Sequence, residues 1–494
     1  MPRNRHILMA AAAGLLMVGV VMVRSAGMGV GGGDAGGAAA VPEALPYAEY
    51  LGAPVASAAG AAWRTGRETL GLDERGGERH PLYAALALAA MLLGSRLDVT
   101  RLAGPRVREG GSGGPGGSSG GGGGALRRPP VLLVGALAVA LGCVLLTFVP
   151  GLSRSVNGSS RWLWVGPVSF QPSELVKWTL VPALAWWCAA QNAGGADGMR
   201  RFGRGLLPAL GLVAAAAGLV LVEDLGTGVL IGAVALAVLL AGGARLWQLG
   251  LIAPVVAAAV AGAIATSPYR VGRLTAFLDP WADPRGTGYH PIQSLAAFAD
   301  GGLFGRGLGN GTQKFHLPED TTDFIFPVFA QELGAPGAVA LVGLYLVLLW
   351  VGLAVAAGRP GPFPRLFAFG VLGTVGAQAA INLAVTTVVV PTKGIALPLV
   401  SAGGTGWVLT AFMIGLVAGL DGRGGQEAQG QEAQRHRGTE AQKAKRAGAA
   451  PRKGPRRAPG GRGGLAPALL SVPLCLCASD GRRPLSTAGG AYGG

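Results

Sequence analysis

The chain has 494 residues, is 50% hydrophobic and only 13% charged, and carries a formal net charge of +16. A soluble globular protein has roughly 25% charged residues, and here the apolar residues fall in long runs instead of at amphipathic spacing. Because runs of about 17–25 apolar residues match the hydrocarbon thickness of a bilayer, the composition excludes a soluble enzyme and predicts a polytopic membrane protein.

The distribution of charge, Cys and His excludes further classes. The segment after Leu420 carries 13 Lys and Arg against 5 Asp and Glu, which is half of the net charge. A basic tail on a membrane protein is typical of a cytosolic face near anionic lipid, so we expect no nucleic-acid binding. The four cysteines lie in apolar runs or in the tail, and the five histidines have no metal-binding spacing. Neither a disulfide framework nor a zinc site is predicted.

Ten apolar segments are predicted to cross the membrane. They cover residues 7–23, 80–95, 130–149, 174–191, 206–222, 226–243, 247–266, 334–357, 364–390 and 404–420. The first is longer than the apolar core of a typical signal peptide and has no small-residue cleavage site after it, so we expect a retained span. The predicted fold class is an all-α polytopic membrane protein with ten transmembrane helices and a large loop between helices 7 and 8.

The charges of the connecting segments predict the orientation. Segment 96–129 carries six Arg against two acids, and segment 192–204 carries three Arg against one. Segment 24–79 carries five Arg against seven acids, and segment 267–322 carries five charges of each sign. Because cytoplasmic loops have an excess of Lys and Arg, both termini are expected in the cytoplasm and the loop between helices 7 and 8 outside it.

Three low-complexity or inserted segments flank this pattern. Residues 24–79 form a long extracytoplasmic insertion in a predicted transmembrane domain of residues 1–420. Residues 104–125 are rich in Gly and are predicted to form a flexible cytoplasmic linker. Residues 421–494 form a basic low-complexity tail that we expect to be disordered.

Polar residues gather in four segments that the orientation places at the outer ends of the helices. In the first, NGSSRWLWVGPVSFQPSELVKW, Arg161 precedes a span, and Glu174 and Lys177 lie one turn apart at its start. One interpretation is an ion pair within an interfacial aromatic belt. The other is a polar cavity, because ionisable groups entering a span are costly unless they are paired or face water.

The second and fourth segments are short. VEDLGTGVL places Glu223 and Asp224 between two spans, and taken alone it is a polar hairpin. PTKGIALPLVSAGGTG places Lys393 and Ser401 among Pro and Gly residues. Non-helical backbone at membrane depth persists only against protein or a water-filled cavity, which favours the cavity interpretation.

The third segment, residues 268–326, is the longest. It contains Arg270, Arg273 and the stretch FLDPWADPRGTGYHPIQS with two Asp-Pro pairs, at Asp279 and Asp283. Loops of this length are usually functional or disordered, and the aromatic and Asp-Pro content argues against disorder. Together the four segments predict a polar cavity that opens outward.

Six motifs in this order resemble the SEDS family (shape, elongation, division and sporulation), which includes FtsW, RodA and SpoVE. They are NGSSRWLWVGPVSFQPSELVK, EDLGTG, FLDPWADPRGTGYH, GLGNGTQKFHLPEDTTDFIF, QELG and PTKGIALPLVSAGG. GLGNGTQK is closer to the FtsW branch than to the RodA branch. The resemblance implies ten transmembrane helices and a place in the bacterial cytoplasmic (inner) membrane.

Some positions depart from the family pattern. Glu223 stands where proline is common, Gln331 replaces the first Glu of EELG, Pro327 replaces a small residue, and Ala402 replaces a Tyr. None of them lies in the Asp-Pro stretch. They bear on substrate geometry and partner contacts rather than on the chemistry.

The resemblance implies a peptidoglycan glycosyltransferase that polymerises lipid II into glycan strands during cell division or elongation. The family's essential acid corresponds to Asp283, which is expected to act as general base toward the acceptor sugar hydroxyl. Help of this kind is worth about 10²–10⁴-fold in rate. Asp279 is instead expected to be a helix cap or turn residue.

The leaving pyrophosphate needs positive charge in a site of low dielectric. The residues predicted to bind substrate are Arg161, Glu174, Lys177, Arg270, Arg273, Lys393 and Ser401. No metal ligand is predicted; a divalent cation is the one open cofactor, although no two-carboxylate cage is visible. The expected partners are lipid II, membrane lipid, a class B penicillin-binding protein transpeptidase and other division or elongation proteins.

Two other functions share most of these features. A flippase for lipid-linked precursors would use the same spans and polar cavity, and a scaffold that recruits a transpeptidase would need the fold but not Asp283. Polymerisation and translocation of lipid II, measured separately, distinguish the three.

Overall fold

The computed structural model describes residues 3–26, 75–103, 129–149, 153–156, 159–165, 168–193, 195, 197–317 and 321–421. Apart from their edges, the predicted insertion at 24–79, linker at 104–125 and tail at 421–494 lie outside these residues. The described part is mostly helical.

The longer helices are α1 (Arg3–Ala26), α4 (Arg75–Arg96), α6 (Val131–Thr147), α7 (Pro172–Asn192), α8 (Leu207–Glu223), α9 (Leu225–Ala241), α10 (Leu246–Ala265), α11 (Pro268–Leu278), α12 (Tyr289–Gly301), α13 (Ile325–Ala357), α14 (Pro362–Thr386) and a C-terminal helix, Gly404–Asp421. The short helical turns are η1 (Val99–Ala103), η2 (Phe202–Leu206), η3 (Pro280–Ala282) and η4 (Gln313–Phe315).

Each of the ten predicted spans overlaps one of these helices. Within the described ranges, six helices are long and apolar enough to cross a membrane: Asn4–Ala26, Phe202–Glu223, Leu246–Ala265, Ile325–Ala357, Pro362–Thr386 and Gly404–Asp421. Helices α6 and α9 are apolar but shorter. The chain is therefore a multi-pass membrane protein, and the full count of ten stays a prediction.

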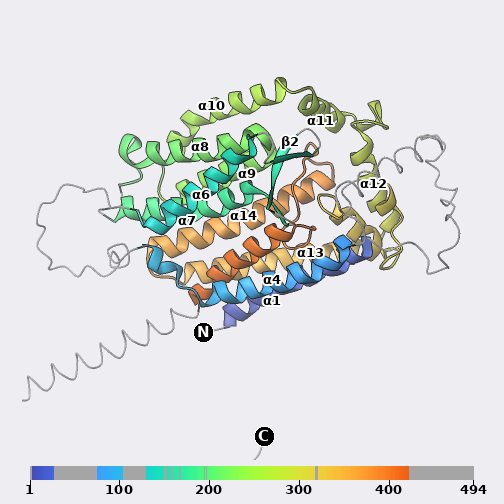
Figure 1. Cartoon of the computed structure of the whole chain (residues 1–494), viewed down its shortest axis with the longest axis horizontal. Helices are drawn as coiled ribbons and strands as arrows, with labels where there is room; N and C mark the ends of the chain where they lie inside the picture. The colour runs from blue at the N-terminus through green and yellow to red at the C-terminus, as the bar shows by residue number, and fades with distance from the viewer. Residues whose placement is uncertain are drawn as a thin grey trace, which may run out of the picture. The chain divides into compact units, whose positions relative to one another are not determined.

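The prediction of an all-α fold missed a small antiparallel sheet between α6 and α7. Its strands are β1 (Ser153–Val156), β2 (Ser159–Val165) and β3 (Val168–Phe170), in the order β1-β2-β3. Leu163 pairs with Ser153 on one side and with Phe170 on the other. The aromatic and β-branched residues of WLWV favour a strand over a helix. The strand β2 (Figure 1), which carries Arg161, packs against α6, α7 and α8.

Helix α14 lies in the core of the bundle and packs against α13, α7 and α9. Its Phe363 and Phe367 are fully buried, and at Gly370 a side chain would lie 2.6 Å from Val181 of α7. Small residues at helix interfaces permit such close approach in membranes. Helix α10 lies at the edge of the bundle (Figure 1), with Leu251 and Val255 exposed as expected of a lipid-facing helix.

The predicted loop between helices 7 and 8 is structured. It contains α11, η3, α12 and η4, and α12 packs along the first turns of α13. At Gly301, the end of α12, a side chain would lie 2.4 Å from the carbonyl oxygen of Ala330. Helix α13 then kinks at Gly334, whose φ is 68°. This segment carries both Asp-Pro pairs.

Candidate functional site

Asp283 lies in an exposed turn between η3 and α12. Its Oδ1 accepts the backbone N–H of Gly286 at 3.0 Å, and its Oδ2 accepts the backbone N–H of Thr287 at 2.8 Å and the Thr287 hydroxyl at 3.2 Å. These donors, the Thr287 backbone N–H foremost, together lower the pKa of Asp283 below its usual value, against an opposing desolvation. Asp283 is therefore an ionised carboxylate that is open to a ligand at neutral pH.

Gly286 and Gly288 permit this turn through close approach. A side chain at Gly286 would lie 2.2 Å from Oδ2 of Asp283, and one at Gly288 would lie 1.9 Å from the carbonyl oxygen of Pro280. Only a residue without Cβ fits at these distances. The backbone donors to Asp283 depend on both glycines.

We expect Gly288→Ala to open the Asp283 turn. The added methyl group overlaps the Pro280 carbonyl, and overpacking of this kind costs typically about 1–3 kcal/mol. Amide exchange of the backbone N–H groups of Gly286 and Thr287, followed by mass spectrometry, should become roughly 5- to 150-fold faster. Gly250→Ala in α10, where the methyl group meets nothing within 4 Å, is the matched control; equal exchange in the two variants would contradict the expectation.

Asp279 caps η3, and its Oδ1 accepts the backbone N–H of Trp281 at 3.1 Å. The predicted capping role of Asp279 is confirmed. Both aspartates accept backbone N–H groups two to four residues ahead, so bonding pattern alone does not single out Asp283.

The Asp283 turn lies against α11. A side chain at Gly272 of α11 would lie 3.3 Å from the Thr287 methyl group, and Thr287 holds the Asp283 carboxylate. His290 of α12 stacks on Phe324, and burial together with the positive charge of the neighbouring Arg273 lowers the pKa of His290 to about 4. Helix α11 therefore contacts the Asp283 turn at Gly272 and carries Arg273, whose charge acts on His290 of α12.

Arg161 is held at the junction of α8 and α9. Its Nε donates to the carbonyl oxygen of Glu223 at 3.0 Å, and its Nη1 lies 3.6 Å from Oδ2 of Asp224. Asp224 in turn caps α9 by accepting the backbone N–H and the hydroxyl of Thr227, at 3.1 and 2.8 Å. The capped helix end fixes the carboxylate that orients Arg161.

Two arginines of α11 and Lys393 complete a group of cations around Asp224. Arg270 donates to the carbonyl oxygens of Val222 and Ala263, and Arg273 donates to that of Thr392 at 3.1 Å. Burial lowers the pKa of Lys393; the negative charge of Asp224 opposes this shift, and the positive charges of Arg270 and Arg273 add to it. The structure thus brings together four of the predicted residues, Arg161, Arg270, Arg273 and Lys393, in what we call the cation cluster.

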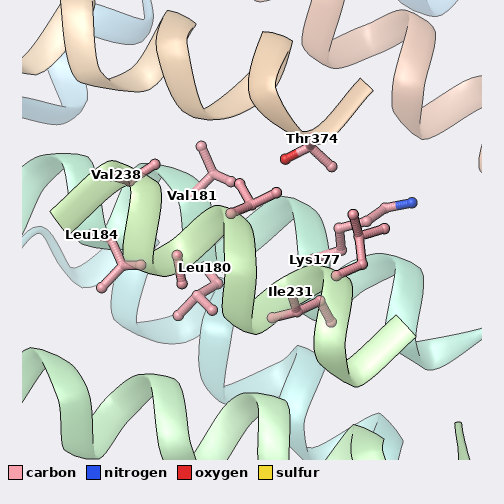
Figure 2. A pocket seen from close by; sticks show the side chains of 10 residues that line it. Lys177, Leu180, Val181, Leu184, Ile231, Val238 and Thr374 are labelled. Carbon is pink, nitrogen blue, oxygen red and sulfur yellow. The ribbon is translucent and has the colours of Figure 1, made fainter. Parts of the chain in front are cut away.

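Glu174 and Lys177 lie inside the bundle instead. Lys177 Nζ is 2.8 Å from Oε1 of Glu174 and 2.7 Å from Oε1 of Gln378, and only 3% of its side chain is exposed. Lys177 lines one end of a small, largely apolar cavity, and Figure 2 shows its nitrogen pointing away from Leu180 and Leu184. Of the two interpretations given for this segment, the arrangement fits an ion pair between Glu174 and Lys177.

Ser401 is fully buried, and its hydroxyl accepts the backbone N–H of Leu397 at 2.7 Å. It orders the turn that follows Lys393, where Leu399 has a φ of 64°. The structure therefore places Ser401 behind the cation cluster rather than in it.

The profile of a family described as "Cell cycle protein", which covers FtsW, RodA and SpoVE, matches residues 132–423. The chain belongs to the FtsW/RodA/SpoVE family.

Individual relatives agree with this membership. The "Probable peptidoglycan glycosyltransferase FtsW" of Nitrosococcus halophilus is 44% identical over 290 residues, which cover 58% of this chain and 74% of the relative. "Stage V sporulation protein E" of Bacillus subtilis is 37% identical over 276 residues, covering 56% and 74%. One solved chain belongs to a peptidoglycan synthase complex that coordinates "polymerization and crosslinking". It is 26% identical to this chain with a TM-score of 0.55, and the match covers 77% of this chain and 99% of the solved one.

Two departures from the SEDS family pattern have a local explanation. The amide nitrogen of Gln331 donates to Oδ2 of Asp300 at 2.6 Å, which a glutamate carboxylate cannot do. Glu223, in the place of the common proline, accepts the hydroxyl of Thr147 at 3.0 Å. Gln331 and Glu223, which depart from the family pattern, therefore each make a polar contact within this chain.

The sequence did not predict a buried polar network that joins α1, η4 and α13. Lys314 Nζ donates to the carbonyl oxygens of Ser25 and Gly309, at 2.9 and 2.7 Å, and lies 3.7 Å from Oε1 of Glu332. Oε2 of Glu332 accepts the Ser25 hydroxyl at 2.5 Å. Lys314 and Glu332 lie in two of the motifs quoted above, but nothing in their spacing indicates that they pair.

The described residues form no metal site made of protein ligands alone. Over the described ranges, no three His, Cys, Asp or Glu side chains come together. The adjacent carboxylates of Glu223 and Asp224 share their surroundings with Arg161, which repels a cation. No step is assigned to a metal.

Proposed function

We propose that this chain is a peptidoglycan glycosyltransferase that polymerises lipid II. The observations that carry the proposal are the exposed, ionised Asp283 turn, which packs against α11 at Gly272, and the cation cluster, to which the same helix contributes Arg270 and Arg273. It suits a substrate that combines a sugar hydroxyl with a pyrophosphate. The 44% identity to a probable peptidoglycan glycosyltransferase supports the same reaction.

In the proposed reaction, Asp283 takes the proton of the acceptor GlcNAc 4-hydroxyl while that oxygen bonds to the anomeric carbon of the donor sugar. The bond from that carbon to the polyprenyl pyrophosphate breaks, and its electron pair leaves with the pyrophosphate. Arg161, Arg270, Arg273 and Lys393 stabilise the departing negative charge, which counts for more in a site of low dielectric. Glu174, Lys177 and Ser401 support the walls of the site.

The donors to Asp283 set the acid limb of the pH profile. A group whose folded pKa is lowered stays ionised to lower pH and is lost as base only when pH falls through that pKa. Thr287→Val removes the hydroxyl donor and keeps the backbone donor, so the pKa of Asp283 rises. As the pH falls, we expect the variant to lose polymerisation activity at a higher pH than the wild type. Above that pH, Asp283 of the variant is a slightly stronger base. Thr287→Ser, which retains the hydroxyl, should keep the wild-type profile; an unshifted limb in Thr287→Val would argue against Asp283 as the titrating base.

The remaining assignments follow from this reaction. Lipid II is reached from the outer leaflet, so we propose that the Asp283 segment is extracytoplasmic, that both termini are cytoplasmic, and that the chain occupies the bacterial inner membrane with ten spans. The structural likeness to a chain of a peptidoglycan synthase complex supports a partner that crosslinks glycan, for which we propose a class B penicillin-binding protein.

Purified chain, reconstituted in liposomes with its co-purified partner and lipid II, tests the proposal. Glycan strands resolved by gel electrophoresis are the expected product, and translocation of fluorescent lipid II is measured in parallel. Translocation without glycan would favour a flippase. Absence of both, with partner binding retained, would favour a scaffold.

A further inference from the structure

The loop between α12 and η4 presents two large apolar side chains at its tip. Leu303 is 70% exposed and Phe304 is 91% exposed. Single exposed apolar residues are common, but a contiguous apolar patch marks a contact with a partner or a membrane. Neither the proposed reaction nor the cation cluster uses them.

This tip is held in place by backbone hydrogen bonds. The N–H of Arg306 donates to the carbonyl oxygen of Gln331, and that of Gly307 to the carbonyl oxygen of Glu332, both at 2.9 Å. The N–H of Ala335 donates back to the carbonyl oxygen of Gly302 at 3.1 Å. Both flanks are thus tied to α13, so the side chains at the tip are presented from a fixed backbone.

The tip lies beside Gly334 of α13, directly before the uncharged residues 335–357. A side chain at Gly334 would lie 2.6 Å from the carbonyl oxygen of Leu303 and 2.7 Å from the carbonyl carbon of Phe304. Residues 335–357 carry no charge, and a helix of that length extends about 35 Å, close to the hydrocarbon thickness of a bilayer. Leu303 and Phe304 therefore lie beside one end of a segment that is long enough to cross the hydrocarbon layer.

The tip also continues the lipid-facing side of α13. Val339, Leu346 and Trp350 are exposed and share one helical face. Ala335, whose N–H bonds the loop, is also exposed and lies four residues before Val339 on that face. The exposed apolar face thus runs without a break from the span onto the loop.

We propose that Leu303 and Phe304 insert into the bilayer at the boundary between headgroups and acyl chains. The ligand of this surface is membrane lipid. Because α12 connects the tip to the Asp283 turn, the insertion fixes the height of that turn above the membrane. The insertion brings the exposed Arg306, which pairs with Asp300 and lies two to three residues from the tip in sequence, close to the lipid headgroups.

Site-directed spin labelling of the full chain in phosphatidylglycerol and phosphatidylethanolamine vesicles tests the proposal. The four native cysteines are replaced by Ala, and a nitroxide is attached through Phe304→Cys. Asn310→Cys, at an exposed polar position of the same loop, is the aqueous control, and Trp350→Cys is the hydrocarbon control. Collision with oxygen, which concentrates in acyl chains, is compared with collision with a water-soluble nickel chelate.

The label at position 304 should show an oxygen-to-nickel accessibility ratio at least threefold above that at position 310 and below that at position 350. A ratio equal to that at position 310 would place the tip in water and overturn the proposal. Low accessibility to both reagents would place it against a second copy of the chain and overturn it equally. The measurement does not depend on glycosyltransferase activity, so failure of the proposed function leaves its outcome unaffected.

Discussion

Asp283→Asn is expected to lower lipid II polymerisation by about 10²–10⁴-fold, the usual worth of a general base. The substituted amide has no basic lone pair for the proton of the acceptor hydroxyl, while its oxygen still accepts one backbone N–H of the turn. The loss should fall on kcat, because proton transfer occurs in the chemical step. Initial rates of glycan formation at saturating lipid II, with the partner present, measure it.

Asp279→Asn is the matched control, since Asp279 sits four residues earlier before another Pro and caps η3 with one backbone contact. It should retain activity within a few-fold. Exchange of the Gly286 and Thr287 amides checks that the Asp283 turn persists in the asparagine variant. Normal polymerisation by Asp283→Asn, or equal losses in both variants, would exclude Asp283 as the base.

Breaking the Lys314–Glu332 pair is expected to have the largest effect on stability. Both side chains are fully buried, and removing one partner of a buried pair leaves an uncompensated charge that costs about 3–5 kcal/mol. Lys314→Met and Glu332→Gln should each lower the free energy of unfolding by about that amount. Unfolding by SDS in mixed micelles, followed by tryptophan fluorescence, measures the change.

The double variant isolates the interaction between the two charges. Lys314→Met with Glu332→Gln leaves no buried charge, so it should be more stable than the sum of the two single effects predicts. Recovery should be incomplete, because the carbonyl oxygens of Ser25 and Gly309 lose their donor. Simple additivity of the single effects would show that the two charges do not stabilise each other.

Much of the candidate site was predictable from residue type and motif order. Arg161, Arg270, Arg273 and Lys393 were expected to gather, and the structure brings them together around Asp224. Glu174, Lys177 and Ser401 were expected to bind substrate as well, but Lys177 and Ser401 are buried, Glu174 is half-buried, and all three are bonded within the protein. Whether a polar side chain faces a cavity or a neighbouring helix depends on the rotation and packing of helices, which a single segment does not encode.

The sequence by itself determined that the protein is helical, spans the membrane several times and belongs to the FtsW/RodA/SpoVE family. Membrane insertion of a long apolar run depends on local sequence, because the side chains of the run favour the bilayer and its helix satisfies its own backbone hydrogen bonds. Only the tertiary structure decided that Lys314 bonds to Ser25, 289 residues away in sequence, and that Gln331 donates to Asp300. It also decided that Leu303 and Phe304 lie beside Gly334, where the uncharged part of α13 begins. Such contacts arise when helices far apart in the chain pack together, and close packing selects partners by shape and position rather than by order in the sequence.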